Sequence, residues 1–364
     1  MTKRLLLAGG GHGHVYVVKR LVHEMPDDLE VVMISDAPNH LYSGMIAGYL
    51  EDIYSLDDVT HKVEEICQKA GVRFIEDRIT AINHNKKTVY GQKDQYTYDY
   101  LGLDLGSAGI KHPNFTGSAI HYVKPASNLV TLKQKLIQEN YPRIAIVGAG
   151  ASGVEITFAI RQNNPEAQII LLNAKENPVD NFNPKSQALV FKAFDKQAIE
   201  YHGQTKVQQI QDQTIETDQG QFQADLIICA LGVTGVDVDF TGFETDDKNY
   251  LKASTQLQVA KDAFALGDMI YIEEFPYITK TGVYAVRESP IYYHNLMATI
   301  KGEANLRDFE APREYLAILN TGNRTAISDH KNKTRSGRLQ FELKNWIDKH
   351  FMRRSYRFRR ESII

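Results

Sequence analysis

Two glycine-rich turns, each between a short apolar strand and a helix, predict an α/β protein with two Rossmann-like dinucleotide-binding domains, the second inserted in the first. In the clearer turn, an apolar strand over residues 144–147 meets Gly148-x-Gly150-x-x-Gly153, and a helical pattern follows at once. The first glycine permits a sharp turn, the second lets a pyrophosphate approach the backbone, and the third lets the helix pack closely on the strand. Free N–H groups of the first helical turn, which contains Ser152, would bind the anion.

A second copy of this pattern stands at the N-terminus. An apolar strand over residues 5–8 runs into Gly9-Gly10-Gly11-His12-Gly13-His14, and an amphipathic helix follows. Gly9 and Gly11 fill the first two glycine positions, whereas His14 occupies the third. A side chain at that position either loosens the packing of helix on strand or places an imidazole near phosphate oxygens. Two such units in one chain imply two nucleotides.

The residues expected at the two ribose positions differ from the usual acid. The second strand of the first unit ends at Ser35-Asp36, so the ribose contact is either the Ser35 hydroxyl or the Asp36 carboxylate, unless Asp36 only caps a turn. In the second unit, Asn173 stands at this position and Lys175 follows two residues later. A carboxylate there would favour NADH and repel a 2′-phosphate, and Asn173 with Lys175 does neither. The choice between NADH and NADPH is therefore open.

The pattern between and after these units predicts the remaining elements. Helices are expected over 57–70, 127–140 and 183–198, and strands over 72–75, 79–83, 88–90, 96–98, 100–105, 205–224 and 226–231. The strand over 100–105 ends at Gly106-Ser107, and that over 226–231 ends before Gly232. Residues 39–48, which include Tyr42, Ser43 and Gly44, form a loop that turns into a helix. This loop either lines a flavin ring or is an ordinary surface loop.

A carboxylate follows a late apolar strand, which stops at Gly267-Asp268. At the carboxyl end of a strand, Asp268 is well placed to bond a ribityl hydroxyl of a flavin, although an acid in a simple turn would look the same. The run Lys280-Thr281-Gly282-Val283 then enters a helix. The N-terminus of that helix, at Gly282 and Val283, would face the pyrimidine end of the flavin, where negative charge accumulates on reduction.

Composition excludes several classes of protein. The 364 residues suffice for two domains, and the longest apolar runs, such as 226–231, are far shorter than the roughly 20 residues of a membrane-spanning helix. Lys3-Arg4 precedes too short an apolar segment for a signal peptide, so we expect a cytoplasmic protein. The only cysteines, Cys67 and Cys229, are 162 positions apart. This spacing excludes the usual redox-active disulfide, and no metal site is expected.

The order of several motifs resembles the pyridine nucleotide-disulfide oxidoreductase superfamily, in particular its type II NADH dehydrogenase branch. More closely, the chain resembles the NADH dehydrogenase-like module that is sometimes fused to selenide, water dikinase, although the dikinase half is absent. The resemblance extends over nearly the whole chain and is carried by His12-Gly13-His14, Tyr42-Ser43-Gly44-Met45, Leu103-Asp104-Leu105-Gly106-Ser107, the run 280–287 and the run 346–354.

The resemblance implies the glutathione-reductase-like FAD/NAD(P) fold. Residues 1–110 and 245–330 would then bind FAD through the first glycine unit and Asp268, and residues 111–244 would bind NAD(P)H. Because no cysteine pair is present, a disulfide reductase and a sulfide:quinone reductase are disfavoured. Electrons would pass from NAD(P)H through FAD to an external acceptor, which is a quinone in the type II dehydrogenases.

Two residues match positions with a role in the resembling proteins. Glu155, two residues after Gly153, matches a glutamate that points toward the contact between nicotinamide and flavin; alternatively, it is a helix-N-terminal acid favoured by the dipole. Lys280 matches a lysine of related quinone reductases and would polarise a quinone carbonyl, unless it is simply solvated. These two residues are the catalytic candidates.

The C-terminal segment differs in charge from the rest of the chain. Residues 331–364 contain 11 Lys and Arg and three acids, a net charge of +8, whereas residues 1–330 contain 31 basic and 42 acidic residues, a net charge of −11. Apolar residues recur in the segment at helical spacing: Leu339, Phe341, Leu343, Trp346, Ile347, His350 and Phe351. A basic amphipathic helix with Trp and Phe is typical of binding to an anionic membrane surface, so we expect peripheral binding at the inner face of the cell membrane. The alternatives are a helix docked on the protein body and an RNA-binding tail, but nucleic acid is not the expected partner.

Three functions therefore compete. The first is a peripheral-membrane NAD(P)H:quinone oxidoreductase that uses FAD. The second is a soluble NAD(P)H-dependent flavin reductase or oxidase. The third is a non-catalytic flavoprotein whose C-terminal segment binds a partner.

Overall fold

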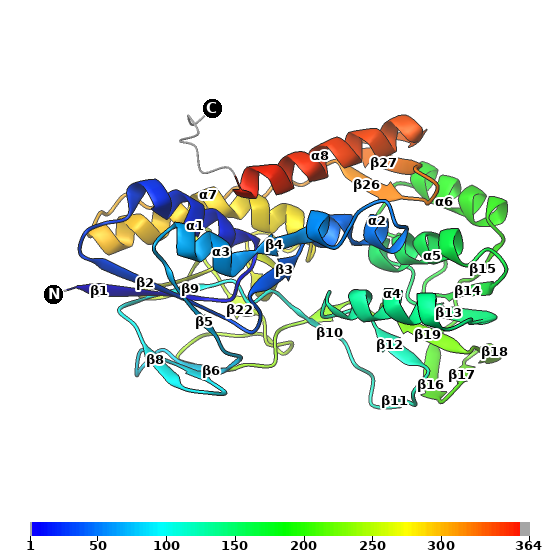
Figure 1. The fold of residues 1–364 in the computed structure, drawn as a ribbon, viewed down its shortest axis with the longest axis horizontal. Coiled ribbons are helices and arrows are strands. Elements are labelled where there is room, and N and C mark those ends of the chain that lie inside the picture. Colours follow the sequence, from blue (N-terminus) through cyan, green and yellow to red (C-terminus); the bar gives the residue numbers. More distant parts are fainter. Residues whose placement is uncertain (1, 357–364) are drawn as a thin grey trace.

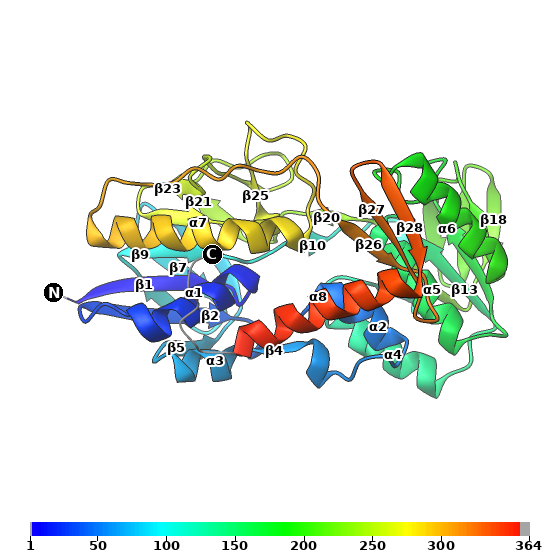
Figure 2. The same ribbon diagram turned by 90° about the horizontal axis from the view of Figure 1, so that it is seen from above.

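Two largely parallel sheets, each built around a strand that precedes a glycine turn, organise the chain and lie side by side along its long axis (Figure 1). The computed structural model describes residues 2–356. Both halves have the α/β architecture predicted from the sequence, which confirms the fold class. A third unit at the C-terminus ends in a long helix that lies along both halves (Figures 1 and 2).

The first half has a six-stranded sheet in the order β23-β24-β9-β1-β2-β5. Its strands are β1 (Lys3–Ala8), β2 (Leu29–Ser35), β5 (Arg73–Glu76), β9 (Tyr100–Leu103), β23 (Gln258–Ala260) and β24 (Ala263–Ala265). Helices α1 (His12–Glu24), α3 (Val63–Lys69) and α7 (Gly282–Lys301) cover one face. The other face carries an antiparallel layer of β6 (Ile79–Asn83), β7 (Thr88–Gly91) and β8 (Gln95–Thr97), with β21 (Asp239–Thr241) parallel to β6. Because both faces of β1 are covered, its residues from Leu5 to Ala8 form a continuous apolar run.

The second half has five parallel strands in the order β12-β19-β13-β14-β15. They are β12 (Ile120–Tyr122), β13 (Arg143–Val147), β14 (Gln168–Leu172), β15 (Ile199–His202) and β19 (Leu226–Cys229). On one face, Ile144 and Ile146 pack with helices α4 (Asn128–Gln138), α5 (Ala151–Asn163) and α6 (Pro184–Lys196). On the other, Ala145 and Val147 pack with the small sheet of β11 (Phe115–Thr116), β16 (Val207–Gln211), β17 (Thr214–Thr217) and β18 (Gly220–Gln223).

The two connections between the halves form an antiparallel pair, β10 (Ala108–Gly109) with β20 (Val233–Thr234). The predicted crossing at 110/111 lies close to this pair. The return was expected at 244/245, but β21 already pairs with β6 of the first half before that point. A short parallel pair of β22 (Leu251–Lys252) and β25 (Ile270–Tyr271) follows. The sequence did not indicate the earlier return because β21 is short and depends on a partner far away in the chain.

The helix predicted over 57–70 begins later than expected. Residues 60–62 instead form β4 (Thr60–Lys62), which pairs with β3 (Asn39–Leu41), and α3 starts at Val63. The predicted loop-to-helix segment 39–48 consists of β3, a short 3-10 turn (Ser43–Met45) and α2 (Ile46–Leu50). The remaining strands and helices lie close to their predicted positions.

The C-terminal unit consists of an antiparallel sheet of β26 (Ala317–Asn320), β27 (Ala326–His330) and β28 (Lys333–Gly337), followed by α8 (Arg338–Tyr356). The boundary predicted at 330/331 falls inside this sheet, between β27 and β28. Lys331 and Asn332, with φ of 49° and 59°, form the two-residue turn that joins these strands, in the conformation that favours tight hairpins. The helix predicted in this segment is present as α8, and Arg357, Arg359 and Arg360 of the basic tail lie outside the described residues.

A polar joint holds the C-terminal sheet on the second half. The carboxylate of Asp329 accepts hydrogen bonds from the backbone N–H and the Nδ2 of Asn183, at 2.8 and 2.6 Å. Asn183 in turn caps α6 by accepting a hydrogen bond from the N–H of Ser186 at 3.0 Å. Its Oδ1 also accepts a hydrogen bond from Thr334 of β28 at 3.0 Å. The joint therefore connects β27, β28 and α6.

We expect Asp329→Ala to weaken this joint, because it leaves two donors of Asn183 without their acceptor. The free energy of unfolding should fall by about 1–3 kcal/mol, and the C-terminal unit should be cleaved faster in limited proteolysis. Asp329→Asn, which retains one acceptor oxygen, should show a smaller loss. Equal stability of Asp329→Ala and the wild type in urea unfolding would contradict this role.

Candidate functional site

The first glycine loop closes on a buried acid that follows β9. A Cβ at Gly11 would lie 2.3 Å from the Asp104 carboxylate, so only glycine fits there. This carboxylate accepts a hydrogen bond from the N–H of His14 at 3.0 Å and thus lies at the N-terminus of α1. Burial raises the pKa of Asp104 to about 6. The motif 103–107 was recognised in the sequence, but the role of its acid was not.

His14 turns away from the loop opening and into the core. Its Nδ1 lies 2.7 Å from the carbonyl oxygen of Gly9, and its Nε2 lies 2.9 Å from the hydroxyl of Tyr292 on α7. Burial lowers the pKa of the imidazole to about 4, so the ring is neutral. Gly102 of β9 makes room for the ring, because a Cβ there would lie 2.3 Å from the Tyr292 hydroxyl. A phosphate contact through the His14 ring, which the sequence left open, does not fit this position.

Open backbone and buried polar atoms without hydrogen-bond partners lie near the N-termini of α1 and α7. Nothing lies within 4 Å of a Cβ built at Gly106, and only His12 lies within that distance of one built at Gly282. Among the described residues, the buried Nδ1 of His12 and the buried Oγ1 of Thr281 have no hydrogen-bond partner. Val283 is half-buried in the first turn of α7. Two helix N-termini, open glycine backbone and unpaired donors fit the phosphates and the polar ring edge of a dinucleotide.

The predicted ribityl acid, Asp268, is bonded to the Gly106-Ser107 turn. Ser107 Oγ donates to Asp268 Oδ2 at 3.0 Å, and Gly267, with φ of 77°, places the acid beside it. A residue that the sequence analysis did not single out completes the group: Lys124 Nζ lies 2.9 Å from Ser107 Oγ and 3.6 Å from Asp268 Oδ2. Lys124 belongs to the second half of the molecule, where it follows β12.

The two ribose candidates of the first unit differ in position. Ser35 is buried at the end of β2, and its Oγ lies 3.1 Å from a Cβ built at Gly10. Ser35 therefore faces the first glycine loop, whereas Asp36 is exposed just beyond it.

Four rings of the first half gather with Phe351 of α8 beside the first glycine loop. His12, His40, His61, Tyr42 and Phe351 have ring centroids 4.9–6.5 Å apart. Burial lowers the pKa of His40 to about 4 and that of His61 to about 3, so these imidazoles are neutral. Of the segment proposed to line a flavin, Tyr42 is in this cluster, Gly44 contacts α8, and Ser43 is exposed.

A buried ion pair attaches α8 to the same loop. Lys344 Nζ bonds Asp348 Oδ2 at 2.7 Å and also donates to the carbonyl of Gly44. The hydroxyl of Tyr42 donates to Asp348 Oδ1 at 3.0 Å. Burial alone would lower the pKa of Lys344, but the charges of Asp348 and Glu155 raise it overall, so the amine is charged. Lys344 and Asp348 are four residues apart on one helix face, which the sequence could have indicated.

The second glycine loop has the geometry its motif predicts. A Cβ at Gly148 would lie 2.3 Å from the carbonyl oxygen of Ala230, and one at Gly153 would lie 2.0 Å from that of Gly148. Gly150 faces open space, Ser152 is exposed in the first turn of α5, and Gly232 is exposed after β19. This half therefore offers a helix N-terminus and accessible backbone to a second dinucleotide.

At the ribose position of this unit, Asn173 shapes its own loop. Its Nδ2 donates to the carbonyls of Lys175 and Asn177 and to the Tyr201 hydroxyl. Lys175 pairs with Asp180, so its charge is partly offset where a 2′-phosphate is expected.

Glu155 of α5 lies where the two halves and the C-terminal unit meet. Its Oε1 accepts a hydrogen bond from the N–H of Asn320 at 2.7 Å, and Asn320 Nδ2 donates to Glu51 Oε1 at 2.8 Å. Burial raises the pKa of Glu155, and burial together with the Glu155 charge raises that of Glu51 to about 7 despite the bond from Asn320. Lys344 and Asp348 are near enough to shift the pKa of Glu155 in opposite directions. Glu155 therefore joins the polar network beneath α8.

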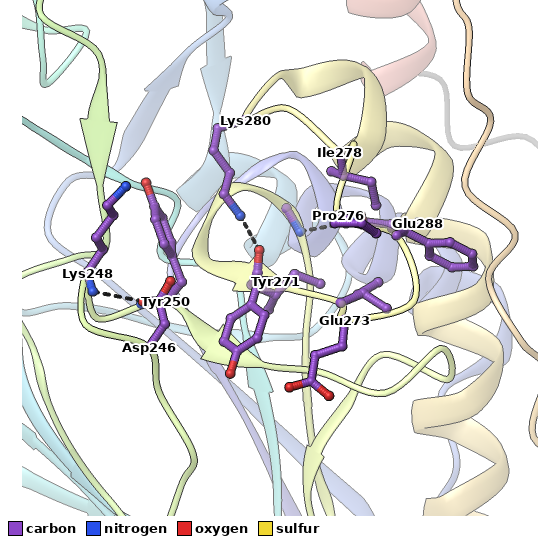
Figure 3. Close-up of a pocket in the computed structure, with 13 residues that line it drawn as sticks. Asp246, Lys248, Tyr250, Tyr271, Glu273, Pro276, Ile278, Lys280 and Glu288 are labelled. Atoms are coloured by element: carbon purple, nitrogen blue, oxygen red, sulfur yellow. Dashed lines mark hydrogen bonds between the residues drawn. The ribbon is translucent and has the colours of Figure 1, made fainter.

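Lys280, the other catalytic candidate, lines a cavity of about 400 Å³ together with Gly267 and Glu288 (Figure 3). Its Nζ donates to the carbonyl of Ile270 and lies 4.2 Å from the centroid of the Tyr250 ring. Burial lowers its pKa. Glu288 lies on the cavity wall and accepts a hydrogen bond from the N–H of Gly267 at 2.6 Å. The polar partners of Lys280 are thus in this cavity and differ from those of Glu155.

Comparison with known proteins indicates the same family as the sequence motifs. The sequence profile described as "Pyridine nucleotide-disulphide oxidoreductase" matches residues 3–289. The chain is 25% identical over 244 residues to the NADH dehydrogenase-like protein YutJ of Bacillus subtilis, covering 64% of this chain and 65% of YutJ, slightly under two thirds of that protein. It is 24% identical over 328 residues to the type II NADH:quinone oxidoreductase of Haemophilus influenzae, covering 73% of each chain.

The chain is also similar to an NADH oxidase in sequence and to a solved NADH complex in fold. The chain is 25% identical over 321 residues to the NADH oxidase of Lactococcus lactis, covering 80% of this chain and 70% of that protein. Its fold matches that of NDH2 from Plasmodium falciparum in complex with NADH, with a TM-score of 0.82, 13% identity and 98% of each chain covered.

We expect Glu288→Gln to stabilise the protein at neutral and higher pH. Burial raises the pKa of Glu288 from 4.5 to about 7, so the folded state holds its proton more tightly than the unfolded state does. The stability that the neutral acid contributes is lost as the pH rises from about 4.5 to 7, and glutamine does not undergo this loss. In urea unfolding with excess FAD, the advantage of Glu288→Gln over wild type should grow by about 1–3 kcal/mol between pH 5 and pH 8. The same change at the exposed Glu303 should show no such trend, and a pH-independent difference for Glu288→Gln would refute the interpretation.

Proposed function

Because the chain belongs to the pyridine nucleotide-disulphide oxidoreductase family and is an NAD(P)H-dependent flavin oxidoreductase that uses FAD, we propose that it passes electrons from the flavin to a quinone at a membrane surface. The resemblance read from the sequence motifs is thereby confirmed at the level of the family. The acceptor, the membrane and the roles of individual residues are our proposal.

The observation that carries the proposal is the state of the two cysteines. Cys67 lies against Met33 in the core of the first half, and Cys229 lies in β19 of the second, each as a free and buried thiol. Burial raises the pKa of each to about 12, so neither is a reactive thiolate. Electrons cannot leave the flavin through a disulfide of this chain and must pass to an external acceptor.

The two glycine loops divide the cofactors between the halves. We assign FAD to the first loop, with Ser35 toward the ribose, Ser107 and Asp268 toward the ribityl chain, and the N-terminus of α7 toward the ring. We assign NAD(P)H to the second loop. The bound cofactors supply the hydride chemistry, and the chain positions them and excludes water. Glu155 bonds α5 to β26, and the Lys344–Asp348 pair bonds α8 to the 42–44 loop, at the junction where the two cofactors would meet.

The outer face of α8 supports docking at a membrane. Leu339, Leu343, Trp346 and Ile347 recur on one face and are exposed, Leu339 to 81% and Trp346 to 65%. The opposite face packs on the protein through Phe341, Lys344, Asp348 and Met352. The helix is therefore docked on the body, as one sequence alternative held, and still presents an apolar stripe.

Strand β28 and helix α8 also carry the basic residues Arg335, Arg338, Lys349, Arg353 and Arg354, beside the exposed acid Glu342. An exposed apolar stripe on a segment with this excess of basic residues suits the interface of an anionic bilayer. None of the helices within residues 2–356 is long and apolar enough to cross a bilayer.

The function can be tested by NADH and NADPH oxidation with a menaquinone analogue or with oxygen, in the presence and absence of anionic lipid vesicles. We expect quinone-dependent turnover that is fastest on vesicles. Turnover that does not respond to quinone would favour the oxidase alternative, which the similarity to the Lactococcus lactis NADH oxidase supports. A protein that binds FAD but does not oxidise either nucleotide would favour the non-catalytic alternative.

We expect the double change Leu339→Ser with Trp346→Ser to separate membrane docking from chemistry. The substitutions remove apolar area from the outer face of α8 and leave its buried face intact. Co-sedimentation with vesicles and turnover on vesicles should fall about tenfold, whereas turnover with a water-soluble quinone should be unchanged. Ile137→Ser, at another exposed apolar residue, is the matched control. Undiminished vesicle binding by the double variant would remove α8 from the proposal.

We expect Glu155→Gln to slow reduction of the flavin by NADH roughly tenfold, because it removes the carboxylate from the junction. Glutamine retains an acceptor for the N–H of Asn320, so FAD content and stability should change little. Stopped-flow bleaching of the flavin measures the effect directly. The exposed Glu166→Gln in the same half is the control, and equal rates in both variants would contradict a role for Glu155.

A further inference from the structure

Lys124 connects the two halves at the proposed ribityl site. It lies in the segment between β12 and α4 of the second half, whereas its partners Ser107 and Asp268 belong to the first. Gly109 of the connecting strand β10 packs on this lysine, because a Cβ there would lie 2.8 Å from its Cβ. Lys124 therefore has a fixed position beside the crossing between the halves.

Negative charge is concentrated around this point. The carboxylates of Asp104, Asp268 and Glu288 lie close enough together that they raise one another's proton affinity: Asp268 acts on Asp104, and both act on Glu288. A flavin reduced by hydride transfer carries additional negative charge on its ring, which such a group of acids disfavours. A cation at the same place would offset the repulsion.

Two lysines are candidates for this cation, and their contacts distinguish them. Lys280 bonds the carbonyl of Ile270 and lies over the ring of Tyr250, and the charges of Asp268 and Glu288 also act on it, raising its pKa against the effect of burial (Figure 3). Lys124 contacts Asp268 and the Ser107 hydroxyl directly. Its charge also reaches His40, whose pKa is lowered first by burial and then by Lys124.

We propose that Lys124 is a residue of the FAD site, contributed by the NAD(P)H-binding half, whose charge stabilises the reduced flavin relative to the oxidised one. The inference rests on FAD binding and on the proposed ribityl site, and it does not depend on the identity of the final acceptor. Lys124 was not singled out in the sequence, and its proposed role differs from the polarisation of a quinone carbonyl that was predicted for Lys280.

A purely structural role for Lys124 would have different consequences. Lys133 of α4 makes a comparable contact between the halves: its Nζ lies 2.6 Å from Asp52 Oδ1 and stacks 4.1 Å from the centroid of the Tyr49 ring. If Lys124 only joined the halves, its loss and the loss of Lys133 would have similar effects. Lys133→Gln is therefore the matched control.

The test measures the midpoint potential of the flavin in the full-length holoprotein by equilibration with reference dyes, and the affinity of the apoprotein for FAD by quenching of flavin fluorescence. We expect Lys124→Gln and Lys124→Met to weaken binding of reduced FAD about tenfold relative to oxidised FAD. This change corresponds to a midpoint potential about 30 mV lower for a two-electron couple. Lys124→Arg should retain most of the wild-type potential.

Lys133→Gln should leave the potential unchanged. The proposal is overturned if Lys124→Gln has the wild-type potential, or if Lys133→Gln shifts it equally. Because the readout is a potential, the experiment remains decisive even if the protein proves to reduce oxygen instead of a quinone. Failure of the apoprotein to bind FAD would instead refute the assignment of the first loop.

Discussion

The architecture depends on one steric constraint that operates twice. In each half, the first glycine of the loop passes so close to the end of the neighbouring strand that no side chain fits: a Cβ at Gly9 would lie 2.2 Å from the carbonyl oxygen of Asp104, and one at Gly148 would lie 2.3 Å from that of Ala230. Both glycines also have φ near 100°, which other residues rarely adopt. This approach brings the helix N-terminus to the carboxyl edge of the sheet, between adjacent strands, where dinucleotides bind in such folds.

Each half alone provides a glycine loop and a helix N-terminus for a nucleotide, and contacts between the units add two lysines to the site. Lys124 reaches from the second half to Asp268 of the first, and α8 reaches from the C-terminal sheet to the 42–44 loop. The buried face of α8 carries the Lys344–Asp348 pair, and its outer face carries the apolar stripe. In the proposed function, one helix therefore both closes the redox site and meets the membrane, so docking and closure would be coupled through its position.

Local patterns predicted much of this fold and a smaller part of the site. The glycine loops, the main strands and the existence of α8 follow from periodicity and turn chemistry within short windows. The hairpin of β27 and β28 was missed even though Asn332 is a turn-favouring residue. These short strands are stabilised by pairing with one another and by packing on α6, which is distant in the sequence. Lys124 and the roles of Asp104 and Lys344 were missed for a related reason. Lys124 and Asp104 act on residues distant in the sequence, and Lys344 bonds the distant Gly44 as well as Asp348, whose spacing on one helix face was the only local signal.

His14 shows why a departure from a motif has to be judged by the packing that the motif serves. The third glycine of the second loop is needed because Gly153 would otherwise place a Cβ 2.0 Å from the carbonyl oxygen of Gly148. In the first loop the same close packing is achieved differently: the His14 ring enters the core and bonds Gly9 and Tyr292, and Gly102 on β9 supplies the space. The glycine that allows close packing is thus Gly153 on helix α5 in the second half and Gly102 on strand β9 in the first. The motif preserves a short distance between helix and strand. A side chain at its third position is compatible with that distance when the facing residue of a neighbouring strand is glycine.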